Sequence, residues 1–161
     1  MYTLFIGNKN YSTWSMRPWI LLKVSGIEFQ EHWIEFDDFS PEGAFKQQVG
    51  ALHPTATVPI LRHQELTIAD SLAICEYIAE LFPDRQLWPE SREQRARARS
   101  ICAEMHSNFG RLRELCPMNI EADLIEIGHA LWQSDAKLRE NLVRIQNIWA
   151  ERPHPDGFLC D

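Results

Sequence analysis

The first 81 residues alternate short apolar segments typical of strands with segments of helical periodicity, and this order constrains the fold most strongly. Apolar, β-branched and aromatic residues at 2–6 and 29–36 predict two strands. A polar turn separates two further short strands predicted at 58–61 and 66–68, as in a hairpin. Helices are predicted at 19–24 before a stop at Gly26, at 41–49, and at 72–81 after a cap at Asp70 or Ser71.

Taken along the chain, these segments form a βαβ unit followed by a ββα unit. The combined order, βαβαββα, is the thioredoxin-like arrangement, and it predicts an α+β domain over residues 1–81. Residues 82–89 contain two prolines and no periodicity, so they are predicted to be a linker. Residues 90–161 have helical spacing throughout and are predicted to form an all-α domain.

Two apolar stripes organise the predicted helical domain. A single helix ending before Pro117 would carry the first stripe, which consists of Ile101, Met105, Phe109, Leu112 and Cys116. A helix capped by Ser134 would carry the second, which consists of Leu138, Leu142, Ile145 and Trp149. A third, shorter helical piece is expected within 120–132.

Charge and composition exclude several classes of function. The net charge of −7 at pH 7 does not favour nucleic acid or an anionic membrane surface, since both attract a basic face. No apolar run approaches the roughly 20 residues of a membrane-spanning helix, and no secretory signal is recognisable, so a cytoplasmic protein is expected. None of the four cysteines lies in a CxxC pair, so a redox motif of the thioredoxin kind is absent, and nothing in the sequence suggests a disulfide framework. Three of them, Cys75, Cys102 and Cys116, are expected to be core thiols.

Three polar features carry the candidate chemistry, and the first is the loop 10–19 between the first strand and first helix. A hydroxyl at the start of a helix lies in a region that favours anions. If that hydroxyl donates to a sulfur atom, it favours thiolate over thiol and lowers the thiol pKa. Ordinary capping by Ser12, Thr13 or Ser15 is the alternative interpretation.

The other two features are Val58–Pro59 and Asp70–Ser71. A cis bond before Pro59 would expose the backbone of Val58 to a peptide-like ligand, whereas an edge-strand proline is the simpler alternative. At a helix start, the Ser71 hydroxyl and helix N–H groups can hold a carboxylate while Asp70 pairs with an ammonium group. An α-amino-acid head group has both charges, although simple N-capping also explains this dipeptide.

Together these segments resemble the glutathione transferase family. Residues 12–17, Ser-Thr-Trp-Ser-Met-Arg, are similar to the serine-containing loop of zeta- and tau-type members. Residues 53–61, His-Pro-Thr-Ala-Thr-Val-Pro-Ile-Leu, are similar to the family's Asn-Pro-x-Gly-Lys-Val-Pro stretch. Residues 70–78 match its acidic-Ser-x-Ala-Ile helix start. The motifs occur in family order over residues 1 to 89, and the chain is most similar to a bacterial member of serine type.

The resemblance implies a role for each matching residue. Ser12 would donate a hydrogen bond to the glutathione sulfur, with Thr13 as the neighbouring alternative. Val58 would pair its backbone with the cysteinyl part of glutathione, before a cis Pro59. The pair Asp70–Ser71 would bind the γ-glutamyl head group. Glutathione is therefore the expected co-substrate, and no metal is expected.

The sequence also departs from the family pattern. Ala56 and Thr57 replace the usual glycine and lysine or glutamine, which leaves the contact to the glycyl carboxylate unassigned. Trp14 stands where zeta-type members have a cysteine, which argues against the isomerase activity of that class. The family continues for several helices beyond the position of Asp161. The helical domain is therefore expected to be incomplete, with exposed apolar surface and part of the acceptor pocket missing.

Two functions from different classes follow from the resemblance. The first is a glutathione S-transferase that conjugates the glutathione thiolate to small electrophilic, apolar substrates, as a detoxifying homodimer. The alternative is a non-catalytic glutathione-binding or protein-interaction module of the same fold, inactive through loss of C-terminal helices. Thiol–disulfide exchange would need a reactive cysteine in the first loop, which has none.

Overall fold

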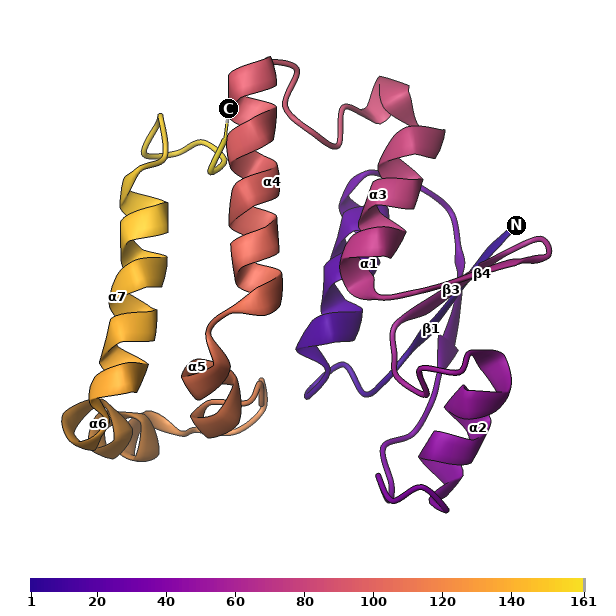
Figure 1. Ribbon diagram of the computed structural model, residues 1–161, viewed down its shortest axis with the longest axis horizontal. Helices are drawn as coiled ribbons and strands as arrows, with labels where there is room; N and C mark the ends of the chain where they lie inside the picture. Colours follow the sequence, from indigo (N-terminus) through magenta and orange to yellow (C-terminus); the bar gives the residue numbers. More distant parts are fainter. Residues whose placement is uncertain (161) are drawn as a thin grey trace. The chain divides into compact units, whose positions relative to one another are not determined.

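A computed structural model describes residues 1–160 and divides the chain into two compact units, Met1–Leu87 and one that begins at Trp88. The elements of the first unit follow the predicted βαβαββα order and confirm the thioredoxin-like α+β fold (Figure 1). They are β1 Tyr2–Ile6, α1 Thr13–Val24, β2 Gln30–Trp33, α2 Ala44–Leu52, β3 Ile60–His63, β4 Leu66–Ala69 and α3 Ser71–Leu81. A 3₁₀ turn at Pro83–Arg85 lies in the segment predicted as a linker.

The four strands form one mixed sheet in the order β2-β1-β3-β4. β1 runs parallel to β2 and antiparallel to β3, and β3 runs antiparallel to β4. Phe5 is paired with Ile60, and Ile60 is paired with Ala69. The last residues of β1, the first of β3 and the last of β4 therefore share one end of the sheet, which we call the site end.

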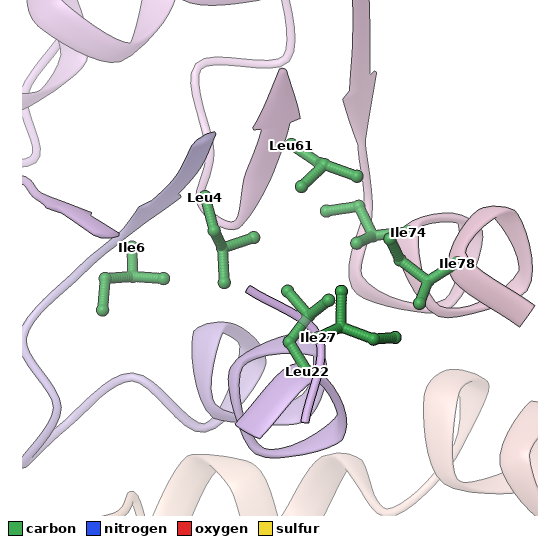
Figure 2. Close-up of a cluster of buried hydrophobic side chains, with 7 residues drawn as sticks. All are labelled: Leu4, Ile6, Leu22, Ile27, Leu61, Ile74 and Ile78. Carbon is green, nitrogen blue, oxygen red and sulfur yellow. The ribbon is translucent and has the colours of Figure 1, made fainter. Parts of the chain in front are cut away.

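A two-sided core holds the sheet in place. Side chains alternate across β1, so Leu4 and Ile6 face one side while Phe5 faces the other. On the first side, α1 and α3 pack against each other and against the sheet, and Figure 2 shows their residues Leu22 and Ile74 pointing toward Leu4. On the second side, the cluster around Phe5 includes two residues of α2 and two of the sheet region: Phe45, Val49, Ile34 and Ile60. Both faces of the central strands β1 and β3 are therefore covered, whereas the edge strand β2 is exposed along its length.

The second unit is all helical, in agreement with the prediction. Its elements are α4 Arg92–Ser107, α5 Gly110–Leu115, α6 Ile125–Ser134 and α7 Ala136–Ala150. Ion pairs connect them: Arg144 on α7 holds Glu104 on α4, with Nε 2.6 Å from Oε1, and Arg111 on α5 holds Asp135, with Nη2 2.5 Å from Oδ2. Arg97 on α4 also pairs with Glu151 at the end of α7, with Nη2 3.1 Å from Oε2. Leu138 is buried, whereas Trp149 of the same stripe is 54% exposed, so the apolar stripe of α7 is only partly covered.

The prediction of one helix through the first stripe is wrong, because the chain breaks between α4 and α5. Asn108 is extended and Phe109 is left-handed, with φ 64°. That turn buries the Phe109 ring, which is 4% exposed. The Arg113 guanidinium donates to the carbonyls of Met105 and Asn108, which satisfies acceptors left open at the end of α4. Helical spacing of apolar residues continues across the break, so the pattern alone could not reveal it.

Three smaller expectations are also corrected. Ser134 ends α6, and the cap of α7 is Asp135, whose carboxylate accepts from the Leu138 N–H at 2.8 Å. Cys116 is exposed instead of lying in a core, because it directly follows the short helix α5. The third strand starts at Ile60 and not at Val58, since Pro59 has no N–H to donate to a ladder.

Candidate active site

The loop between β1 and α1 places two buried serines at the start of α1. Ser12 is the N-cap, is 7% exposed, and accepts from the Ser15 N–H at 3.3 Å. Its hydroxyl oxygen lies 2.8 Å from Ser15 Oγ. Ser15 is 3% exposed, and its Oγ also accepts from the Gly7 N–H at 3.1 Å. The two hydroxyls therefore form a buried pair at the positive end of a helix, where an anion is favoured.

Hydrogen bonds at both ends hold this loop in one conformation. The Asn8 carbonyl accepts from the N–H groups of Tyr11 at 3.1 Å and Ser12 at 2.8 Å. On the outer side, the Glu31 carboxylate of β2 accepts from Trp19 Nε1 at 2.5 Å and pairs with Lys9 Nζ at 2.5 Å. Partial burial raises the pKa of Glu31, but the hydrogen bonds from Lys9 and Trp19 outweigh it and leave that pKa below its usual value.

The segment before β3 has the predicted cis bond between Val58 and Pro59. Two residues earlier, Ala56 has φ 47°, in the left-handed region that favours glycine. This explains why the family pattern has glycine there. Lys46 of α2 donates to the Ala56 carbonyl at 2.9 Å and ties this segment to α2. Lys46 is a supporting residue that the sequence analysis missed, because no local pattern connects positions ten residues apart.

The turn from β4 into α3 contains the third predicted feature. Asp70 is the N-cap, and its Oδ1 accepts from the N–H groups of Leu72 at 2.8 Å and Ala73 at 3.2 Å. Its backbone has φ 84° and ψ 132°, a region that non-glycine residues rarely adopt. Ser71 is 1% exposed, yet its hydroxyl is buried without a hydrogen-bond partner among residues 1–160. A buried hydroxyl in that state is available to a ligand.

Strand register brings all three features to the site end. The loop with Ser12 leaves the end of β1, Val58 precedes the start of β3, and Asp70 follows the end of β4. The predicted site residues therefore converge on one end of the sheet from three segments of the first unit. A surface hollow bordered by Tyr2, Phe29 and Phe82 lies at the opposite end, away from these residues.

Within the described part of the chain, neither a metal site nor a membrane span is found. No group of three or more His, Cys, Asp or Glu side chains among residues 1–160 could hold a metal ion. No helix over the same residues has the length and apolar character needed to cross a bilayer.

Comparison with known proteins agrees with this architecture. The family model described as "Glutathione S-transferase, N-terminal domain" matches residues 11–81. A maleylacetoacetate isomerase from Rattus norvegicus is 32% identical over 149 residues, which are 91% of this chain and 58% of that protein. A glutathione transferase homolog from Burkholderia gl BGR1, solved with bound glutathione, is 32% identical with a TM-score of 0.58, over 71% of this chain and 60% of that chain.

A more distant structure extends the likeness in fold to the helical unit. The glutathione S-transferase of the Antarctic clam Laternula elliptica aligns with 99% of this chain and 69% of its own, with a TM-score of 0.70 and 19% identity. The family match over residues 11–81 and the sheet order agree, and the first unit of this chain is a glutathione S-transferase N-terminal domain. The chain spans about half the length of the curated relatives it matches, 46% and 58% for two of them.

Proposed function

We propose that this chain is a glutathione S-transferase that binds glutathione at the site end and presents its sulfur as a thiolate to small electrophilic, apolar acceptors. The observation that carries the proposal is the buried Ser12 hydroxyl at the N-terminus of α1. It lies on the same end of the sheet as the Ser71 hydroxyl, which has no hydrogen-bond partner among residues 1–160. A hydroxyl and a helix N-terminus stabilise negative charge, whereas neither is suited to act as a strong base or nucleophile alone.

The γ-glutamyl part, the cysteinyl part and the sulfur of glutathione each have a complementary group at this end. The γ-glutamyl carboxylate would accept from the Ser71 hydroxyl, and its ammonium group would pair with Asp70. The unusual backbone of Asp70 supports this role, since residues held in rare backbone regions cluster at ligand sites. The backbone of Val58 would pair with the cysteinyl residue. The Thr13 hydroxyl, one residue into α1, is the second candidate donor to sulfur.

The catalytic effect would come from stabilising the nucleophile. A thiol with the ordinary pKa of about 8.5 is mostly protonated at neutral pH. A hydrogen bond from Ser12 to the thiolate, together with the field of α1, favours the deprotonated form. Each unit by which the thiol pKa falls corresponds to about 1.4 kcal/mol of preferential interaction with the thiolate. The protein would form no covalent bond with either reactant.

The wider properties of the family are part of the same proposal. We expect a cytoplasmic homodimer that detoxifies electrophiles and needs no metal. The sequence boundaries 1–81, 82–89 and 90–161 are kept as the proposed division into glutathione-binding domain, linker and helical domain. None of these properties is needed for glutathione to bind at the site end, so each can be tested separately.

Maleylacetoacetate isomerisation is a second candidate, favoured by the relative from Rattus norvegicus. The resemblance to zeta-type members places a cysteine where this chain has Trp14, and the Arg17 guanidinium lies 4.1 Å from the centre of the Trp14 ring. A bulky indole stacked under a cation cannot supply a thiol. We therefore rank conjugation ahead of isomerisation. A non-catalytic glutathione-binding module remains the alternative outside enzyme chemistry.

Two measurements on the purified chain separate these functions. Calorimetric titration with glutathione tests binding, and conjugation of glutathione to a chromogenic aryl halide tests turnover. Binding with turnover supports the transferase, and binding without turnover supports the non-catalytic module. Absence of glutathione binding would contradict both. Turnover of maleylacetoacetate faster than of the aryl halide would favour the isomerase.

A further inference from the structure

At the start of α1, the hydroxyl oxygens of Ser12 and Ser15 each accept a hydrogen bond from a backbone N–H, and the two oxygens also contact each other. Each serine hydroxyl has one proton to donate and two lone pairs that accept. Ser15 Oγ accepts from the Gly7 N–H, and Ser12 Oγ accepts from the Ser15 N–H. The 2.8 Å contact between the two oxygens needs one further proton, which either hydroxyl can supply by rotating about its C–O bond.

The two directions of this contact have different consequences. When Ser12 donates to Ser15, the Ser12 proton is used inside the pair, and the Ser15 proton has no other acceptor among residues 1–160. When Ser15 donates to Ser12, the Ser15 hydroxyl is fully satisfied and the Ser12 proton is free to point at a ligand. A buried hydroxyl proton without an acceptor is unfavourable, so a bound anion beside Ser12 selects the second direction.

We propose that Ser15 is a positioning residue for the reaction, which holds Ser12 in the donor orientation and strengthens its hydrogen bond to the glutathione sulfur. This inference rests on the proposed function, because it needs a sulfur anion beside Ser12. With the sulfur anion bound, the relay would run from the Gly7 N–H to Ser15 Oγ, from the Ser15 hydroxyl to Ser12 Oγ, and from the Ser12 hydroxyl to sulfur. Its middle step reverses the bond from Ser12 to Ser15 that the structure has. Donors in such a chain polarise one another, and no covalent bond changes.

Both hydroxyls of this relay are buried, which shields their hydrogen bond from water. Ser15 and Ser12 are 3% and 7% exposed, so water does not compete for the contact between them. Ser15 lies within the first turn of α1, where its backbone N–H is already capped by Ser12. The loop from Gly7 to Ser15 therefore links the end of β1 directly to the sulfur position.

The test is a double-mutant cycle that reads the pKa of the protein-bound glutathione thiol from thiolate absorbance. Ser15→Ala should raise that pKa by about half a unit, a roughly threefold loss of thiolate at neutral pH, with glutathione affinity changed less than threefold. In a Ser12→Ala background, Ser15→Ala should cause no further rise, because Ser15 acts through Ser12. Ser91→Ala is the matched control, since Ser91 caps α4 by accepting from the Gln94 N–H at 3.3 Å. It should leave the thiol pKa unchanged.

Several results would overturn the relay. An unchanged thiol pKa in Ser15→Ala, with glutathione still bound, removes the role of Ser15 while leaving the proposed function intact. Equal rises in both backgrounds would mean that Ser15 acts independently of Ser12. If Ser15→Ala does not fold, Ser15→Cys retains an acceptor for Gly7 but is a weak donor, and an unchanged pKa in that variant overturns the relay equally. Failure of the unmutated chain to bind glutathione refutes the proposed function itself.

Discussion

Single residues at the site end have a structural role as helix caps and a proposed role in ligand binding. Ser12 and Asp70 are both N-caps, the role that their sequence context predicts most simply. Capping occupies an acceptor lone pair of Ser12, so its hydroxyl proton can be donated either to Ser15 or to a ligand. Capping and ligand binding are therefore compatible at these positions, and mutations can separate them.

Removal of the Ser12 hydroxyl tests the chemical role. Ser12→Ala should lower turnover about 10- to 100-fold, because a hydrogen bond to a charged group contributes roughly 1.5–3 kcal/mol. Glutathione affinity should change only a few-fold, since most of the ligand is held elsewhere. Steady-state kinetics with a chromogenic aryl halide, beside calorimetric binding, measure both quantities. Thr13→Ala is the comparison variant. A larger loss of turnover in Thr13→Ala than in Ser12→Ala would show that Thr13 is the donor to sulfur.

Two substitutions at Asp70 separate the cap from the charge. Asp70→Ala removes the cap of α3 and should reduce the free energy of unfolding by about 1 kcal/mol. Asp70→Asn keeps a capping oxygen, so its stability should stay near that of the unmutated chain. Both variants lose the negative charge, and both should bind glutathione about tenfold more weakly. Denaturant unfolding and calorimetry provide the two readouts. Unchanged affinity in Asp70→Asn would restrict Asp70 to capping.

The sequence predicted the order of helices and strands well, but it predicted their first and last residues less accurately. Apolar periodicity identified every strand and helix of the first unit, because most of these elements contribute side chains to its two buried clusters. The break between α4 and α5 was not predictable, since Phe109 adopts φ 64° for a tertiary reason, the burial of its ring. The hydroxyl pair of Ser12 and Ser15 was also invisible, because sequence spacing does not reveal which way two side chains turn.

The break in the helical unit should depend on the buried ring of Phe109. Phe109→Ala should lower the free energy of unfolding by about 3–5 kcal/mol, the usual cost of removing a buried phenylalanine. Ile125→Ala on α6 is the matched control, because Ile125 is 74% exposed and its truncation should change stability by less than about 0.5 kcal/mol. Denaturant unfolding compares the two variants. Similar small effects in both would show that Phe109 does not fix the α4–α5 turn.

For the whole molecule, acid stability should reflect the ion pairs Arg111–Asp135 and Arg144–Glu104 of the helical unit. Hydrogen bonds from Arg111 hold the pKa of Asp135 below its usual value, and those from Arg144 do the same for Glu104. A carboxyl group whose pKa is lowered on folding stabilises the protein above its unfolded pKa of about 4. That contribution is lost as the pH falls through the lower, folded value.

The thermal midpoint of the unmutated chain should therefore drop as the pH is lowered from about 5 toward 2. Asp135→Asn keeps a capping side chain for α7 but removes the charge that Arg111 binds. Its midpoint should be lower at pH 6 and should fall less steeply in acid. Calorimetric melting from pH 2 to pH 7 measures the slopes. Parallel curves for the two proteins would show that the Arg111–Asp135 pair does not contribute.

The central claim is that the site end of the thioredoxin-like unit stabilises glutathione as a thiolate. Ultraviolet titration of the protein–glutathione complex, with thiolate absorbance followed from pH 5 to pH 10, tests it most directly. The predicted result is a bound thiol whose pKa lies at least one unit below the ordinary value of about 8.5, with the shift largely lost in Ser12→Ala. A saturated complex whose thiol titrates at or above that ordinary value would contradict the account.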